Sequence, residues 1–244
     1  MPATAPSVPT STPTRAPMPA AKAVLLAGLF AALFVSGAAA SDLTTPEAAV
    51  AAYLDGVASH DLAAVLAASA VEPMSEQFDF PAYVDRYQAL NVAVPVPATD
   101  PMLVAINRAN FTAQIVRQVQ FLTYGLLSTV DIDQGRPLPM DAAAASAFAA
   151  EIDLSRLEAL VVRQIGEVEL PADKQPRYRA NAAAQAVTYG AYEQVERGAV
   201  LDFEGASYLV GFTLLRYGDT WGVSSQSSAL LGTSSLGAPQ RVTP

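Results

Sequence analysis

The single histidine of this 244-residue chain, His60, is the first residue to consider for chemistry. Asp61 follows it, and an imidazole oriented by a carboxylate is a common general base. Both residues lie in the corner of "YLDGVASHDLAAVLA", between two stretches whose apolar residues repeat with helical spacing. Adjacent side chains in so short a corner rarely point the same way, and histidine tolerates the left-handed backbone that such corners need. We therefore interpret His60 as a solvated corner residue.

Covalent, metal-dependent and nucleotide chemistry find little support in the rest of the chain. It has no cysteine, and Lys174 is its one lysine beyond the first 40 residues. It also contains no Gly-x-Ser-x-Gly nucleophile motif, no phosphate-binding loop and no dinucleotide-binding glycine motif. Residues 131–142, "DIDQGRPLPMDA", have the paired aspartates of a calcium loop, but Ala142 stands where a bidentate glutamate is required. The sequence thus predicts no metal, no cofactor and no assignable catalytic residue.

Carboxylates and tyrosines are the groups left for acid–base chemistry. One cluster lies within a short stretch of sequence and consists of Asp79, Tyr83, Asp85, Arg86 and Tyr87. A second set of aromatic residues could line a cavity and consists of Tyr189, Tyr192, Tyr208 and Trp221. The alternative is that the aromatic side chains pack in the core and the acidic ones are solvated. We favour this alternative because aromatic residues usually serve packing.

The N-terminal 40 residues have the pattern of an export signal. Residues 23–35, "AVLLAGLFAALFV", form an apolar run of signal-peptide length after two basic residues. Ala38 and Ala40 occupy the small-x-small positions of a signal peptidase site, which places the cut before Ser41. The competing interpretation is an uncleaved membrane anchor over residues 23–40, which are uncharged and just long enough to span a bilayer. Either way, the positive start predicts an exported body, and we expect a bacterial protein that is secreted or attached to the outer face of the cytoplasmic membrane.

The body that follows this segment is acidic. All 23 acidic residues lie beyond position 41, whereas the whole chain has 14 basic residues and a net charge of −9. Phosphate backbones repel such a surface, so we predict no nucleic-acid partner. The hydrophobic fraction of 52% and the charged fraction of 15% indicate a folded domain.

Helices are expected in the first part of the body. Thr45 can cap a helix that begins at Pro46, and Asp61 can cap a second one. The prolines between residues 71 and 101 favour an extended path with at most a short helix at 82–90. Apolar spacing and alanine content predict two more helices, over 102–128 and 140–151.

The C-terminal third is typical of a sheet. Three consecutive strands are predicted across 200–226, with turns at Glu204-Gly205 and Gly218-Asp219. Another strand ends at Pro171, and its alternation places Val162 and Ile165 on opposite faces. Residues 176–192 suit a helix or a strand equally. The serines, glycines and prolines near the end predict a flexible tail over 232–244, which leaves 41–231 as a single α+β domain.

Two regions resemble the nuclear transport factor 2-like superfamily. They are residues 44–70, with "TPEAAVAAYLDGVASHDLAAV", and residues 200–226, with strands that close in "YGDTWGV". The resemblance implies N-terminal helices packed on a curved, mainly antiparallel, cone-like sheet with an apolar cavity, and it leaves 71–175 as a long helical and looping insertion. Enzymatic members, such as steroid isomerases and polyketide cyclases, place an acidic or histidine base in that cavity. No residue of this sequence can be matched to that role, and many members are binding or assembly modules.

These observations predict an exported, non-catalytic binding or interaction domain. Its partner is expected to be a small apolar ligand or another protein, and residues 23–40 would serve as a membrane tether if they are retained. The alternative is a cofactor-free isomerase or cyclase that uses a pocket carboxylate and a tyrosine. A third interpretation is an accessory domain that works beside an envelope complex.

Overall fold

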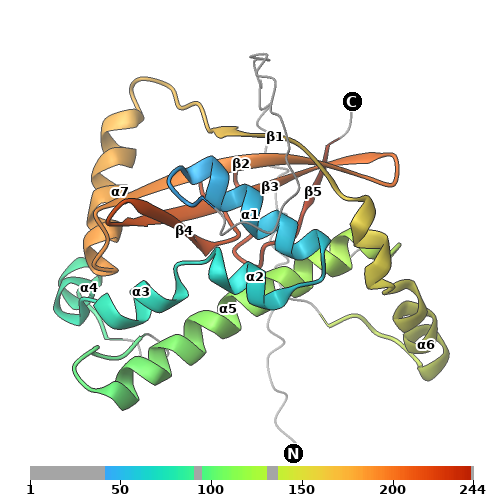
Figure 1. Ribbon diagram of the computed structural model, residues 1–244, viewed down its shortest axis with the longest axis horizontal. Helices are drawn as coiled ribbons and strands as arrows, with labels where there is room; N and C mark the ends of the chain where they lie inside the picture. The colour runs from blue at the N-terminus through green and yellow to red at the C-terminus, as the bar shows by residue number, and fades with distance from the viewer. Residues whose placement is uncertain (1–41, 91–94, 131–136, 243–244) are drawn as a thin grey trace, which may run out of the picture. The chain divides into compact units, whose positions relative to one another are not determined.

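The structure of the protein is a computed structural model, and it describes residues 42–90, 95–130 and 137–242. Most helices come first and most strands last, with one helix between β1 and β2 (Figure 1). Among the described residues, no helix has the length and apolar character needed to cross a bilayer. The proposed export segment and its processing residues Ala38, Ala40 and Ser41 lie outside these ranges.

The first two helices confirm the predicted corner at His60. Helix α1 spans Pro46–Ala58, and Thr45 caps it by accepting a hydrogen bond from the Ala48 N–H at 3.1 Å. Helix α2 spans Leu62–Ala67 and is capped by the Asp61 side chain. His60 lies between them, exposed, with a φ of 57°. The histidine therefore serves the turn, as its sequence position indicates.

The segment after α2 is more helical than its prolines led us to expect. Two short helices, α3 (Val71–Gln77) and α4 (Phe80–Tyr87), replace the single one predicted at 82–90. Pro73 and Pro81 fit because each lies in the first turn of its helix, where the missing N–H removes no helical hydrogen bond. Asp79 caps α4 by accepting from the Ala82 N–H.

A long helix crosses the middle of the chain, as predicted. Helix α5 spans Pro101–Leu127 without a break at Gly125. A Cβ at Gly125 would lie 2.6 Å from Pro239 Cδ, so glycine lets the C-terminal segment lie against the helix. Helix α6 (Ala142–Glu151) confirms the alanine-rich prediction, and a 3₁₀ turn, η1 (Leu154–Ala159), follows it. The acidic half of the calcium-like loop, at 131–136, lies outside the described residues.

The strands form an open, antiparallel sheet. They are β1 (Val161–Glu167), β2 (Glu193–Phe203), β3 (Ala206–Tyr217), β4 (Thr220–Ser225) and β5 (Gln240–Val242). The order is β1-β2-β3-β4, and β5 pairs with β3 (Figure 1). The two predicted turns are correct, since Gly205 and Gly218 adopt the positive φ angles that tight hairpins need. The protein is therefore of the α+β class, with N-terminal helices packed on a C-terminal sheet.

Two details of the fold differ from the sequence prediction, and a third settles a stretch that the sequence left open. The pairing of β1 with β2 shifts between Val162 and Gln164, so Val162 and Ile165 both pack against the core instead of facing opposite sides. The ambiguous stretch becomes helix α7, Gln175–Thr188. Part of the expected tail forms β5, because β3 extends beyond β4 and leaves an unpaired edge that this segment fills.

The main core lies between α1 and the sheet. Ala49, Val50 and Tyr53 of α1 are 0% exposed, as is Phe212 of β3. The rings of Tyr53 and Phe212 meet edge to face with 5.6 Å between centroids. Residues 68–70 cover the free edge of β4, since the Val223 N–H donates to the Ala68 carbonyl and the Ala70 N–H to the Val223 carbonyl. This side of the sheet is filled with apolar side chains.

Candidate functional site

Strand β2 presents two chemically different faces, because successive side chains of a strand point in opposite directions. The Arg197 side chain reaches Glu47 of α1, to whose Oε1 its Nε donates at 2.5 Å. The next side chain, Glu196, therefore lies on the opposite face, where Thr213 of β3 is its partner in register. The candidate site is on this second face.

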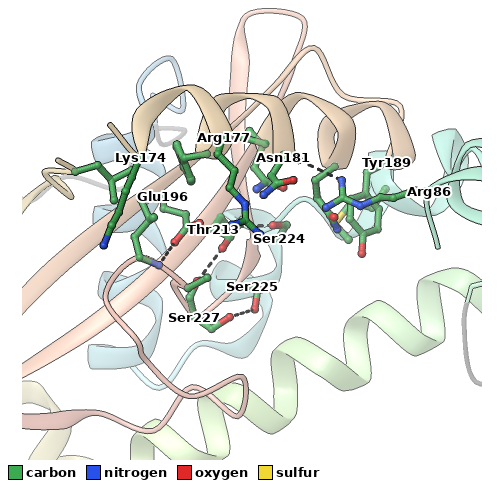
Figure 2. A pocket seen from close by; sticks show the side chains of 18 of the residues that line it. Arg86, Lys174, Arg177, Asn181, Tyr189, Glu196, Thr213, Ser224, Ser225 and Ser227 are labelled. Carbon is green, nitrogen blue, oxygen red and sulfur yellow. Dashed lines mark hydrogen bonds between the residues drawn. The ribbon is translucent and has the colours of Figure 1, made fainter. Parts of the chain in front are cut away.

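A cavity of about 810 Å³ lies between α7 and that face, and we call it the α7 cavity (Figure 2). Its walls come from α3, α4, α5, α7, the strands β2, β3 and β4, and the loops before α7 and after β4. The resemblance implied an apolar cavity in a cone-like sheet, without saying which face of the sheet is hollow. Core side chains fill the α1 side of the sheet, and the hollow lies on the opposite face.

Hydroxyl groups form one wall of the α7 cavity. Thr213 Oγ1 donates to the Ser227 carbonyl at 2.8 Å, and Ser224 Oγ donates to the Thr213 carbonyl at 3.1 Å. The hydroxyls of Ser225 and Ser227 lie 2.8 Å apart and bond to each other. These bonds hold the wall in one arrangement and join β3 to the loop after β4 (Figure 2).

Three basic side chains line the same cavity. Lys174 and Arg177 come from the start of α7, and Arg86 comes from α4, where its Nη1 donates to the Asn181 carbonyl at 3.1 Å. Within the described residues, none of the three makes an ion pair with a carboxylate. Five other arginines of that part of the chain do so: Arg108, Arg156, Arg163, Arg197 and Arg216. No described carboxylate therefore neutralises these basic groups by a salt bridge.

The cavity also contains a buried carboxylate. Glu196 is 7% exposed, and its Oε2 accepts hydrogen bonds from Ser228 Oγ at 2.5 Å and from the Leu230 N–H at 3.0 Å. Both bonds tie the loop after β4 to β2. Beside it, burial raises the pKa of Tyr178 to about 12, and the negative charge of Glu196 adds to the rise.

The two residue sets singled out in the sequence are only partly brought together. Arg86 and Tyr189 line the α7 cavity. Trp221 is 8% exposed and belongs to the core, and Asp79 is a helix cap. Two other aromatics line separate hollows, Tyr192 beside α7 and Tyr208 beside α5.

Other residues of the site were not identified from the sequence. Arg177 and Glu196 lie in stretches with no motif, and their approach depends on α7 folding back onto β2. The run "SSQSS" was noted for its hydroxyls, but hydroxyl content alone does not indicate a cavity wall. Within the described ranges, no three His, Cys, Asp or Glu side chains lie close enough together to hold a metal ion.

Comparisons with known proteins add the fold and no function. No family model matches the sequence, and no curated protein is similar to it. A solved structure is similar: a cystatin-like protein from Ruminococcus gnavus ATCC 29149, with a TM-score of 0.55 and 19% identity. The match covers 80% of this chain but only 44% of that protein. The chain thus shares its α+β fold with a cystatin-like protein, and this likeness supports the predicted resemblance at the level of the fold alone.

Proposed function

We propose that this protein is a non-catalytic binding domain whose ligand occupies the α7 cavity. The observation that carries the proposal is the cavity itself. Its volume of about 810 Å³ falls within the roughly 300–1,000 Å³ typical of small-molecule sites. Hydroxyl, amide and charged groups line it beside apolar side chains such as Met74, Leu170 and Leu230, which favours a polar ligand with an apolar face over the small apolar ligand predicted from the sequence.

A blocking substitution tests this proposal. Ala229 is exposed and lines the cavity, so Ala229→Trp places an indole in it without disturbing the core. Ala149 is exposed on α6, outside the residues that line the cavity, and Ala149→Trp is the matched control. Neutral, anionic and cationic polar metabolites are added to the full chain, and the thermal unfolding midpoint is measured.

The expected result is that at least one class of metabolite raises the midpoint of the wild type and of Ala149→Trp, but not of Ala229→Trp. A compound that binds the folded protein and not the unfolded chain raises the thermal unfolding midpoint. If no class raises the midpoint, or if Ala229→Trp responds like the wild type, the cavity is not a binding site.

A second candidate function is a cofactor-free acid–base enzyme. The observation that favours it is a buried carboxylate, Glu196, in the same cavity as Tyr178. Against it, Glu196 already accepts two hydrogen bonds that anchor the loop after β4. Ketones with exchangeable α-protons, incubated with the protein in D₂O, distinguish the two. A binding domain leaves the exchange at the buffer rate, whereas an enzyme accelerates it and loses that rate in Glu196→Gln.

We further propose that the protein is exported and that cleavage occurs between Ala40 and Ser41. The support is the apolar run at 23–35 followed by small residues. Mass spectrometry of the chain produced in a bacterial host, after separation of medium, envelope and cytoplasm, is expected to give a mature form that begins at Ser41. An intact N-terminus in the membrane fraction would instead establish the anchor.

A further inference from the structure

The charge of the α7 cavity is opposite to the charge of the chain. Arg86, Lys174 and Arg177 line it against Asp173 and Glu196, whereas the whole chain has 14 basic and 23 acidic residues. Glu196 is moreover engaged with the loop after β4. A cavity with excess positive charge inside an acidic protein favours an anionic ligand, because its field raises the local concentration of anions.

Arg177 is the residue best placed to hold an anionic group. It belongs to the first turn of α7, and its side chain points into the cavity towards Thr213 and Ser224 (Figure 2). A guanidinium pairs with a carboxylate through two parallel hydrogen bonds, which fixes both the position and the orientation of the acid. Lys174 and Arg86 lie on either side of it along the cavity (Figure 2).

The hydroxyl wall selects for a different part of the ligand. Thr213 Oγ1 and Ser224 Oγ each donate their proton to a backbone carbonyl. A hydroxyl has one proton and two lone pairs, so both oxygens are left to act as acceptors. The group that complements them is a donor, and the hydroxyls of a sugar are donors of the right kind.

From these features we infer that the α7 cavity binds an acidic saccharide, whose carboxylate pairs with Arg177 and whose hydroxyls donate to the wall formed by Thr213 and Ser224. The inference rests on the proposed function and adds the chemical class of the ligand.

A neighbouring hollow fixes the direction in which the acid faces. It has a volume of about 700 Å³ and shares Tyr178 and Glu196 with the α7 cavity. Four carboxylates line it, those of Glu167, Glu169, Glu193 and the shared Glu196, against the two guanidinium groups of Arg179 and Arg197, so its net charge is negative. This acidic side repels a carboxylate, so the acid end of the ligand faces Arg177 and the neutral end faces the neighbouring hollow.

The test is calorimetric titration of the full chain with D-glucuronate, D-glucose and inorganic sulfate. D-Glucuronate is expected to bind, and D-glucose to bind at least about tenfold more weakly, because glucose lacks the carboxylate that makes charged hydrogen bonds to Arg177. Arg177→Gln is expected to weaken glucuronate binding by a similar factor, with partial recovery in Arg177→Lys. Thr213→Val is expected to weaken glucuronate binding severalfold and leave sulfate binding unchanged.

Arg179→Gln is the matched control. Arg179 lies on the same helix and carries the same charge, but it lines the neighbouring hollow and bonds to Gln175. Its loss changes the net charge of the protein as Arg177→Gln does, so it corrects for long-range electrostatics. Binding of glucuronate by Arg179→Gln is expected to stay within about twofold of the wild type, since exposed charges act weakly at a distance in salt.

Several outcomes would overturn the inference. Equal binding of D-glucose and D-glucuronate, or an unchanged affinity in Arg177→Gln, shows that the acid is not recognised. Sulfate binding as tight as glucuronate binding shows a simple anion site. Failure of the wild type to bind glucuronate also overturns it. In each case the response of Ala229→Trp to the broader metabolite panel decides separately whether the cavity binds ligands at all.

Discussion

The two faces of the C-terminal sheet use the same strands for different purposes. Under α1 the face is dry, and Ala199, Leu201 and Phe212 are 0% exposed. Under α7 it is hollow, and Glu196 and Thr213 face a cavity of about 810 Å³. Neighbouring residues of one strand therefore belong to a core and to a candidate binding site. Any strand can separate two environments in this way, because successive side chains of a strand point to opposite faces of the sheet.

This contrast shows how a hollow polar face can coexist with a stable fold. Burial of apolar area on the α1 side supplies the main stabilisation, at roughly 25 cal/mol per Å². On the α7 side the polar groups bond to one another, as Thr213 does with Ser227. Across the described part of the chain, no buried side-chain nitrogen or oxygen lacks a hydrogen-bond partner. The cavity face thus avoids the penalty of unsatisfied polar groups.

The sharpest test of the contrast compares two adjacent residues of β3. Phe212→Ala is expected to lower the free energy of unfolding by about 3–5 kcal/mol, because it leaves a void in the dry core. Thr213→Ala removes a partly exposed hydroxyl on the hollow face and is expected to lower it by about 1 kcal/mol or less. Urea unfolding of the two variants measures both values.

Equal losses in the two variants would contradict the division of the sheet into a dry face and a hollow face. Leu214→Ala extends the test along the same strand. Leu214 is 0% exposed and lies on the same face as Phe212, so it is expected to behave like Phe212→Ala.

A smaller effect is expected where the core meets the loop after β4. Gln226 is 0% exposed, accepts from the Tyr53 hydroxyl at 3.1 Å and donates to the carbonyls of Gln118 and Gly237. Gln226→Leu keeps the volume but leaves these groups unpaired, so a loss of about 1–3 kcal/mol is expected from urea unfolding.

Gln226→Glu provides the companion measurement. It retains an acceptor for Tyr53 but removes the donor and introduces a buried charge, so it is expected to destabilise the protein at least as strongly as Gln226→Leu. If Gln226→Leu unfolds like the wild type, this glutamine does not hold the C-terminal segment in place.

The sequence predicted the helices and hairpins whose signals are local. Thr45 and Asp61 have the residue types that cap helices, and Gly205 and Gly218 allow the turns of two hairpins. Signals that depend on tertiary context were missed or left open. The shift in β1 near Arg163 has no local marker, and α7 could not be distinguished from a strand until β2 covered one side of it.

The candidate site was predictable only in part for the same reason. Arg86 was noted because acidic and aromatic residues surround it in the sequence, and Tyr189 was noted as a cavity aromatic. Arg177 and Glu196 are 19 positions apart in the sequence (196 − 177). Only the packing of α7 on β2 brings them to the same cavity.

The smallest expected effect is on the pH dependence of the free energy of unfolding. A tyrosine on each face of the sheet, Tyr53 or Tyr178, reports on that face. Burial raises the pKa of Tyr178 from 10.0 to about 12, and burial raises the pKa of Tyr53 in the same direction. Above pH 10 the unfolded chain loses phenol protons that the folded chain retains. The free energy of unfolding is therefore independent of these groups below pH 10 and falls as the pH rises from 10 through about 12.

The comparison is made with Tyr53→Phe and Tyr178→Phe by urea unfolding from below pH 10 to about pH 12. Tyr53 is 0% exposed in the dry core, whereas Tyr178 lines the cavity and is partly exposed. Solvent screens the cavity tyrosine, so Tyr53→Phe is expected to remove more of the alkaline slope than Tyr178→Phe. A larger change in Tyr178→Phe would mean that the cavity excludes water as strongly as the core does. A ligand that fills the cavity is expected to extend the alkaline slope of the wild type to higher pH, because it desolvates Tyr178 further and leaves Tyr53 as it was.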